Sequence, residues 1–479
     1  MNGTTVQALS TLHEQGWAPR ISITVNTPTP LDAGGSQRPS NGGAWSPLQE
    51  LSGVVSLTSR EPLTIKHAQI SFEGETRVHT QSVSKEDQRR IVTRKSRYKF
   101  LTQSLDLDNL ERSNPPEAGF CHYSSQFHFI ISKWVTPRSG SAPRQCLTLP
   151  PTFCHGPILT DDADNTTYAQ PLIEYNLRIV AVFTDSHATG GAVKVSDQLE
   201  IHIQAGPEVF PPCDTEDWFS DLVTKQSHSL RPSIFSFQKY TMNVIAHEPS
   251  PVLMVVAHPF ETTEVVIRVV VTASPRNVDI GAFATFLQRI GFKIIPGLRA
   301  KTFYSTQPFP KLPAQALLTV DGPHRLHDQI LKLEQVDRSL TSWRLVATNA
   351  APLSDRGAIV RSTIGHKIHP PRSDPTPPAE WHSEISFSIK LPNDVTPTFC
   401  SAIAARQYSL IILLKASGIS IENFVLEVPI QLVSAPTLSN SVYWSDSGDG
   451  LSNVYEPEHL DYEQDSCKVI YDDPPPKYI

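Results

Sequence analysis

Histidine and cysteine are the side chains in this sequence best suited to catalysis or metal binding, but their spacing matches no common reaction centre. His366 and His369 form an HxxH pair in a proline-rich stretch, and without a third ligand nearby a solvated pair is favoured over a zinc site. Cys154 and His155 are neighbours in sequence, which does not make them a nucleophile and its base. The sequence has no GxGxxG loop, P-loop, GxSxG elbow or HExxH motif. We therefore predict no catalytic residue, no metal site, no cofactor and no enzymatic activity.

Binding chemistry is indicated more strongly, first by a PPxY peptide that Pro475, Pro476 and Tyr478 form. Consecutive prolines favour the polyproline II helix, so little ordering entropy is lost when an aromatic-lined groove receives the proline rings. The tyrosine ring fills a second pocket and supplies specificity. These residues predict binding to WW domains.

The motif lies in a segment, residues 436–479, whose composition predicts a disordered acidic tether. From Ser441 onward there are nine acidic residues against Lys468 and Lys477, a net charge of −7. A highly charged segment with few branched apolar residues cannot bury enough surface to offset its ordering entropy. Random-coil scaling gives such a tether a reach of about 35 Å.

A run of six cations within eleven residues offers a second binding feature. Its members are Arg89, Arg90, Arg94, Lys95, Arg97 and Lys99. One interpretation is a solvated loop leading into an exposed strand face. The other is a patch for acidic or phosphorylated segments of a membrane-protein tail, or for anionic lipid headgroups. Nucleic acid is not an expected partner, because the chain has a net charge of −7 and no aromatic platform interleaves the cations.

Composition limits the class and compartment of the protein. A chain of 479 residues has room for two or three domains, and 41 prolines disfavour long helices. The cysteines are scattered without a CxxC pair, which is the usage of a reducing compartment and not of a disulfide scaffold. No signal peptide is evident, and no apolar run approaches the length of a membrane span. We therefore expect a soluble cytoplasmic protein.

Short β-type runs with alternating apolar residues make up most of the chain, which predicts an all-β fold. The first region, residues 17–205, contains predicted strands at 21–25, 53–57, 65–72, 98–105, 127–133, 175–185 and 199–205. Residues 206–231 resemble a linker with a short helix near 214–223. The second region, residues 232–435, contains predicted strands at 233–240, 252–258, 264–272, 292–295, 340–347, 384–390, 408–415 and 424–433. Residues 279–290 have helical spacing but also suit the entry to a buried strand.

An internal repeat links the two regions. The sequence Pro-Thr-Phe-Cys occurs at 151–154 and again at 397–400, each time between an alternating strand and a Tyr-x-Leu strand that begins at Tyr175 or Tyr408. A four-residue identity in the same order of elements is unlikely by chance. Two homologous β-sandwich lobes in tandem are the economical explanation.

These features together resemble the α-arrestins, the arrestin-related trafficking adaptors best known in fungi. The resemblance covers residues 17–435 and rests on the repeated Leu-Pro and Pro-Thr-Phe turns, a last strand ending in Val428-Pro429-Ile430-Gln431-Leu432, and the PPxY tail. Many relatives have two PPxY peptides, whereas this chain has one clean copy, which puts avidity for paired WW domains in doubt. The resemblance implies two tandem arrestin-like, immunoglobulin-like β-sandwich lobes followed by the acidic tail.

The function implied by the resemblance is that of a ubiquitin ligase adaptor. Such a protein recruits a WW-domain HECT-type ligase to an integral membrane transporter or receptor, at the plasma membrane or endosomes, and promotes ubiquitination and endocytosis of that cargo. A related alternative is an arrestin-like scaffold in ambient-pH signalling. From another class, the alternative is a β-sandwich enzyme or carbohydrate-binding module, which secretion would favour.

Overall fold

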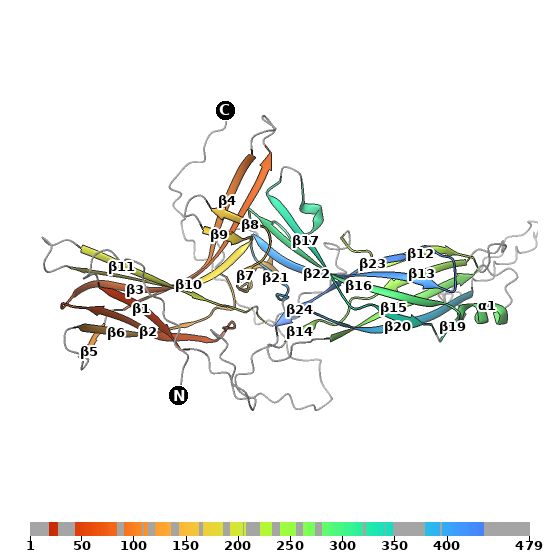
Figure 1. The fold of residues 1–479 in the computed structure, drawn as a ribbon, viewed down its shortest axis with the longest axis horizontal. Coiled ribbons are helices and arrows are strands. Elements are labelled where there is room, and N and C mark those ends of the chain that lie inside the picture. Colours follow the sequence, from red (N-terminus) through yellow and green to blue (C-terminus); the bar gives the residue numbers. More distant parts are fainter. Residues whose placement is uncertain are drawn as a thin grey trace, which may run out of the picture. The chain divides into compact units, whose positions relative to one another are not determined.

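A computed structural model shows a predominantly β fold, as the sequence predicts, with one α-helix in the part of the chain that it describes (Figure 1). The described residues are 19–26, 44–83, 91–107, 110–113, 120–135, 143–161, 166–184, 192–204, 206, 221–231, 240–254, 262–273, 280–319, 322–340, 342–347, 379–392 and 395–434. Their side chains form two large hydrophobic cores, one mainly from residues 21–203 and the other from residues 230–432.

The first core lies between two antiparallel sheets. One has the order β1-β2-β6-β5, with β1 (Arg20–Val25), β2 (Glu50–Ser59), β6 (Cys121–Ile130) and β5 (Glu111–Ser113). The other has the order β11-β10-β3-β4, with β11 (Ala192–Ile201), β10 (Leu172–Thr184), β3 (Thr64–Val83) and β4 (Ile91–Asp106), and β7 (Phe153–Cys154) also pairs with β10. A small hairpin joins β8 (Ile158–Asp161) to β9 (Thr166–Ala169), and η1 (Arg144–Leu147) precedes β7.

The second core also lies between two antiparallel sheets. One has the order β12-β13-β15-β20-β19, with β12 (Lys225–Leu230), β13 (Tyr240–Ala246), β15 (Thr262–Ala273), β20 (Ala379–Lys390) and β19 (Arg344–Ala347). The other contains β17 (His324–Lys332), β16 (Gly291–Ser305), β22 (Ala404–Ser417) and β21 (Phe399–Cys400) in that order, with β18 (Val336–Ser339) on β16 and β23 (Phe424–Ile430) on β22. The remaining elements are β14 (Val252–Met254), β24 (Leu432–Ser434), α1 (Ile280–Leu287) and η3 (Gln315–Leu317).

The alternation of apolar and polar residues explains why these segments form strands. In β10, every second residue from Ile173 to Phe183 is buried, while the residues between them are exposed or half-buried. Because successive side chains in a strand point to opposite faces, this pattern gives the strand one buried face. Tyr175 lies at the centre of that face, with its ring 6.0 Å from Phe72 and 5.5 Å from Phe100 between centroids.

The structure differs from the sequence prediction at β13, which begins where the predicted strand 233–240 ends, and at two polar strands. Strand β12 lies inside the predicted linker, and β17 was not predicted. Both have few apolar residues: β12 is an edge strand in which Leu230 is the one fully buried side chain, and β17 has no buried side chain. Hydrophobic periodicity cannot detect such strands. The helical spacing at 279–290 corresponds to the helix α1, whereas most of the helix predicted near 214–223 lies outside the described residues.

Asp197 on the edge strand β11 is a carboxylate that the fold buries without satisfying. Its side chain faces inward with 9% exposure, and its Oδ2 has no hydrogen-bond partner. Burial raises the pKa of this carboxyl above the ordinary value of 3.8. An inward-facing charge on an edge strand discourages pairing with another sheet, which explains why such a destabilising group is tolerated.

We expect Asp197→Asn to increase the free energy of unfolding at neutral pH by about 1 kcal/mol, because it removes a buried charge that lacks a full set of partners. The Asp197 carboxyl has a higher pKa in the folded state than in the unfolded state, so the folded protein binds the proton more tightly. The wild type therefore gains stability as the pH falls through the raised pKa of the folded state toward 3.8. The advantage of the asparagine variant should therefore shrink at low pH. Urea unfolding of both proteins at neutral pH and at about pH 4 measures this. An equal advantage at both pH values would contradict the assignment.

Candidate functional site

The predicted WW-binding residues Pro475, Pro476 and Tyr478 lie outside the described residues, as does the whole acidic segment 436–479. The same holds for two of the predicted cations, Arg89 and Arg90. The structure therefore bears on the remaining cations and on the repeated Pro-Thr-Phe-Cys sequence.

The described cations Arg94, Lys95, Arg97 and Lys99 lie within strand β4, which begins at Ile91 and forms a sheet edge. Arg94, Lys95 and Arg97 are exposed, and Lys99 is half-buried. Because side chains alternate along a strand, Lys95, Arg97 and Lys99 share one face and Arg94 lies on the other. The sequence run is thus divided between two faces of the ribbon that β3 and β4 form.

Acidic residues on neighbouring strands neutralise part of the face that bears Lys95, Arg97 and Lys99. Lys99 Nζ lies 2.7 Å from Glu73 Oε2, and Arg97 Nε lies 3.2 Å from Glu75 Oε1. Arg77 adds another cation to the same face, with Glu75 and Glu174 each 2.6 Å away. Much of the charge is therefore balanced within the sheet, and the interpretation as an ordinary solvated face gains weight from these pairs.

The two Pro-Thr-Phe-Cys copies form the same local structure. Thr152 N donates to Ile203 O (2.8 Å) and Ile203 N donates to Thr152 Oγ1 (2.9 Å). In the second copy, Thr398 N donates to Leu432 O (2.7 Å) and Leu432 N donates to Thr398 Oγ1 (3.0 Å). Each threonine therefore joins its copy to the last strand or bridge of its own region.

The tyrosines of the two Tyr-x-Leu strands also make equivalent contacts. The hydroxyl of Tyr175 donates to Pro150 O, and that of Tyr408 donates to Thr396 O (2.6 Å). Each acceptor lies two residues before the threonine of its copy. Each Phe-Cys pair forms a two-residue strand against its Tyr-x-Leu strand, β7 on β10 and β21 on β22. The sequence repeat is thus a repeat of structure.

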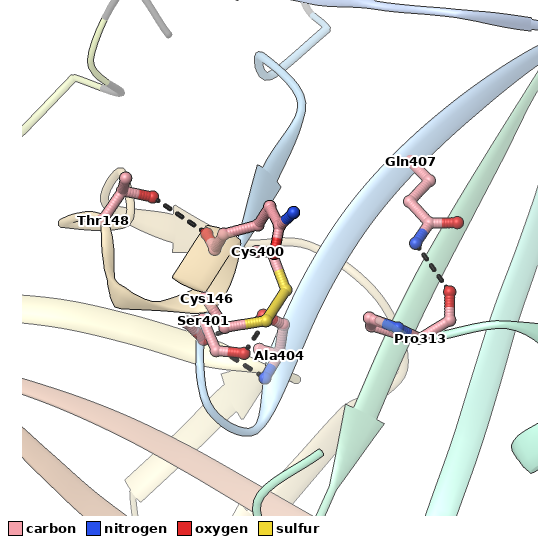
Figure 2. The surroundings of a disulfide bond; sticks show 8 residues. Cys146, Thr148, Pro313, Cys400, Ser401, Ala404 and Gln407 are labelled. Carbon is pink, nitrogen blue, oxygen red and sulfur yellow. Dashed lines mark hydrogen bonds between the residues drawn. A yellow bond between two sulfur atoms is a disulfide. The ribbon is translucent and has the colours of Figure 1, made fainter. Parts of the chain in front are cut away.

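The two copies meet each other. The rings of Phe153 and Phe399 lie edge to face with centroids 5.1 Å apart. Cys400 of the second copy forms a disulfide with Cys146 of η1, 254 residues away in sequence (Figure 2). Both sulfurs are buried beside Phe303 and Phe309. We call this region the repeat junction: residues 146–156, 302–309, 327–329 and 399–408.

The disulfide corrects the interpretation of the cysteines as scattered and unbridged. The spacing rules that detect disulfide frameworks and zinc sites apply to cysteines near one another in sequence. Here proximity arises because η1 packs against β21. Of the other described cysteines, Cys121 is free and buried, and Cys154 is free and exposed. Cys154 is the counterpart of Cys400 in the repeat, so the disulfide uses one copy and not the other.

A row of polar residues crosses the sheet at the repeat junction. Arg406 of β22 lies directly opposite Thr302 of β16, which lies directly opposite His327 of β17, so all three share one face. His155, just after β7, has its ring centroid 6.3 Å from that of His327 and donates from Nε2 to Gln329 Oε1 (3.0 Å). Burial lowers the pKa of His327, and the neighbouring His155 and Arg406 lower it further, while Asp328 acts in the opposite sense.

A second charged network on the opposite face of this sheet is fully paired. Arg299 Nε donates to both carboxylate oxygens of Asp328 (2.9 and 3.1 Å), and its Nη1 donates to Glu427 Oε2 (2.8 Å). Lys301, which is buried, lies 2.9 Å from Glu427 Oε1, and Ser409 donates to the same oxygen (2.6 Å). Two cations balance two carboxylates, which suits a structural network better than a ligand site.

Over the described parts of the chain, no group of three or more histidine, cysteine or acidic side chains is arranged to hold a metal ion. Within the same residues no helix is long and apolar enough to cross a membrane. No protein-family model matches the sequence, and comparison with curated proteins gives no match.

Sequence reasoning found the repeat but missed the residues that the repeat brings together. His155 directly follows the first Pro-Thr-Phe-Cys copy and Arg406 lies just before the second Tyr-x-Leu tyrosine, but nothing in the sequence indicated that the two residues belong to one junction. One signal was present: Arg406 lies two residues before the second Tyr-x-Leu tyrosine, where the first copy has Ile173. A charged residue at the position of a core isoleucine marks a site worth inspecting.

Proposed function

We propose that this protein is an adaptor that recruits a WW-domain HECT-type ubiquitin ligase to an integral membrane transporter or receptor. The observation that carries the proposal is the PPxY peptide of Pro475, Pro476 and Tyr478 within a strongly acidic segment. A proline-rich peptide needs little ordering to enter a WW groove. The adaptor itself performs no chemistry; it raises the concentration of cargo lysines near the ligase.

The duplicated β architecture supports the same proposal. Two copies of one hydrogen-bonded motif, each bonded to the last strand or bridge of its own region, are consistent with tandem arrestin-like lobes. In this interpretation residues 17–205 and 232–435 form a body that binds cargo, and residues 436–479 present the ligase motif. The exposed cations of β4 are the first candidates for contact with an acidic cargo tail or an anionic membrane.

A paired experiment on the full chain tests both halves of the proposal. Tyr478→Ala should weaken binding of an isolated WW domain by about 50-fold or more, because the second pocket loses its ring, while membrane proteins should still co-purify. Tyr471→Ala, in the same acidic segment but outside the motif, is the matched control. Combined Arg94→Gln and Lys95→Gln should do the opposite and reduce co-purifying membrane protein, with Lys194→Gln at an exposed position of β11 as the control.

Titration calorimetry measures the WW arm, and quantitative mass spectrometry of the co-purified membrane proteins measures the cargo arm. Unchanged WW binding by Tyr478→Ala would discard the ligase assignment. If the Arg94 and Lys95 variant still bound both the WW domain and the membrane protein, the cations of β4 would be an ordinary solvated strand edge and not a cargo site. Salt should weaken the cargo arm more than the WW arm, since exposed charges are screened within about 8 Å at physiological ionic strength.

A further inference from the structure

Arg406 is a buried cation without an anion. Its side chain is 4% exposed, and its hydrogen-bond partners are neutral: Nε donates to Tyr408 Oη (3.0 Å) and Nη1 donates to Thr302 Oγ1. The guanidinium also lies over the rings of Phe153 (5.8 Å) and Tyr408 (5.2 Å). Among the described residues no carboxylate forms an ion pair with it. Buried charges in proteins are ordinarily paired, so this one calls for an explanation.

The internal repeat shows that the motif itself does not require a charge at this position. In the second copy, Phe399 of β21 pairs with Arg406 of β22. In the first copy, the equivalent Phe153 of β7 pairs with Ile173 of β10. Ile173 is fully buried and belongs to the first hydrophobic core. One copy of the same local structure thus folds with isoleucine where the other has arginine. Replacing a buried charge by a well-packed apolar residue is often neutral or stabilising, so arginine here is not explained by stability.

The third guanidinium nitrogen is free to receive a ligand. Nη2 of Arg406 makes no hydrogen bond, yet it is not among the described polar atoms that are both fully buried and unpaired, so it keeps contact with solvent. His327 lies two strands away on the same face, and the ring of His155, from the facing copy, lies 6.3 Å from that of His327 between centroids. His155 is exposed and His327 is half-buried.

We propose that Arg406, His327 and His155 form a binding site for a phosphate-type oxyanion at the repeat junction. Charge-assisted N–H donors gathered on one sheet face suit a compact dianion, and the arginine supplies its charge at every physiological pH. Each histidine adds a ring nitrogen that can donate an N–H. Because the site takes residues from both copies, a bound anion would also hold the two copies together. The site is independent of the WW motif and of the cations on β4.

The carboxylate of Asp328 does not serve as the anion for Arg406. Asp328 neighbours His327 in sequence but lies on the opposite face of β17, where its carboxylate is bound to Arg299. Gln329 is engaged by His155, and Tyr408 uses its hydroxyl proton for Thr396 O. Asp328 is therefore committed to Arg299, and the polar neighbours Gln329 and Tyr408 are uncharged.

Titration calorimetry of the full chain with inorganic phosphate and with sulfate, against chloride at equal ionic strength, tests the site. We expect saturable binding of both dianions. Arg406→Ile, which installs the residue of the first copy, should keep the β-rich circular dichroism spectrum and weaken both anions by about tenfold or more, the loss of one charge-assisted contact. Absence of saturable binding to the wild type, or equal binding by the wild type and Arg406→Ile, would overturn the proposal.

His155→Gln tests the histidine side of the site in the same sulfate titration. His155 is exposed, so the fold tolerates this change, and the variant should bind sulfate more weakly than the wild type. His128→Gln, at an exposed position of β6, is the matched control and should not change sulfate binding. Loss of fold in Arg406→Ile would leave His155→Gln to decide, and sulfate binding equal to wild type in that variant would refute the site.

O-phosphoserine as a third titrant distinguishes the two sources of the group. Binding tighter than inorganic phosphate assigns the site to a phosphorylated side chain, and weaker binding assigns it to the free anion. Both results support a phosphate-type site.

Discussion

Tyr175→Ala is expected to lower the free energy of unfolding by about 4 kcal/mol, within the range found for truncating large buried aromatic side chains. The ring is fully buried and packs against Phe72 and Phe100. Its hydroxyl donates to Pro150 O, and its burial raises the pKa of the phenol well above 10.0, so the group stays protonated and keeps donating. The substitution therefore removes both the centre of the first core and the tie to the Pro-Thr-Phe-Cys turn.

Tyr175→Phe separates the two contributions. It keeps the ring and leaves Pro150 O without its donor, which should cost about 1–2 kcal/mol. Urea unfolding followed by tryptophan fluorescence and circular dichroism measures both variants. If the alanine variant were no less stable than the phenylalanine variant, the ring would not be the packing centre that its surroundings indicate.

Cys146→Ser is expected to lower the free energy of unfolding by about 4 kcal/mol in the absence of reductant, because a bond that closes a loop of more than a hundred residues strongly restricts the unfolded chain. Reductant should destabilise the wild type by a similar amount and leave the variant unaffected. Cys154→Ser is the matched control, since this exposed thiol is the repeat counterpart of Cys400 and forms no disulfide. Its stability should equal that of the wild type in both conditions.

Peptide mapping after thiol blocking provides an independent measurement. Under non-reducing conditions Cys146 and Cys400 should be found joined, whereas Cys154 should be labelled readily. Labelling of Cys146 and Cys400 in the folded protein would show that the bond is absent and would remove the expected stability difference. That result would also favour the reducing compartment that the cysteine spacing indicates.

The repeat shows how far local patterns reach. Alternating apolar residues identified most long strands, including those at Ile21, Tyr175 and Tyr408, because alternation reports directly which face of a strand is buried. The duplicated Pro-Thr-Phe-Cys sequence also marked a duplicated structure, since each threonine and tyrosine bonds within its own region. The predicted ends of the strands were less accurate, and β4 extends back through the cations because polar side chains suit an exposed edge.

The sequence by itself thus determined the β class of the fold, the repeat and the PPxY peptide, all of which depend on residues close together in the chain. Tertiary structure alone decided that Cys146 meets Cys400, that Arg97 and Lys99 face acidic residues, and that Arg406 shares a sheet face with His327, next to which His155 lies. These contacts join segments up to 254 residues apart, and their partners follow from strand order and register. Register is set by the packing of whole faces, so no local pattern around Arg406 could reveal what it meets.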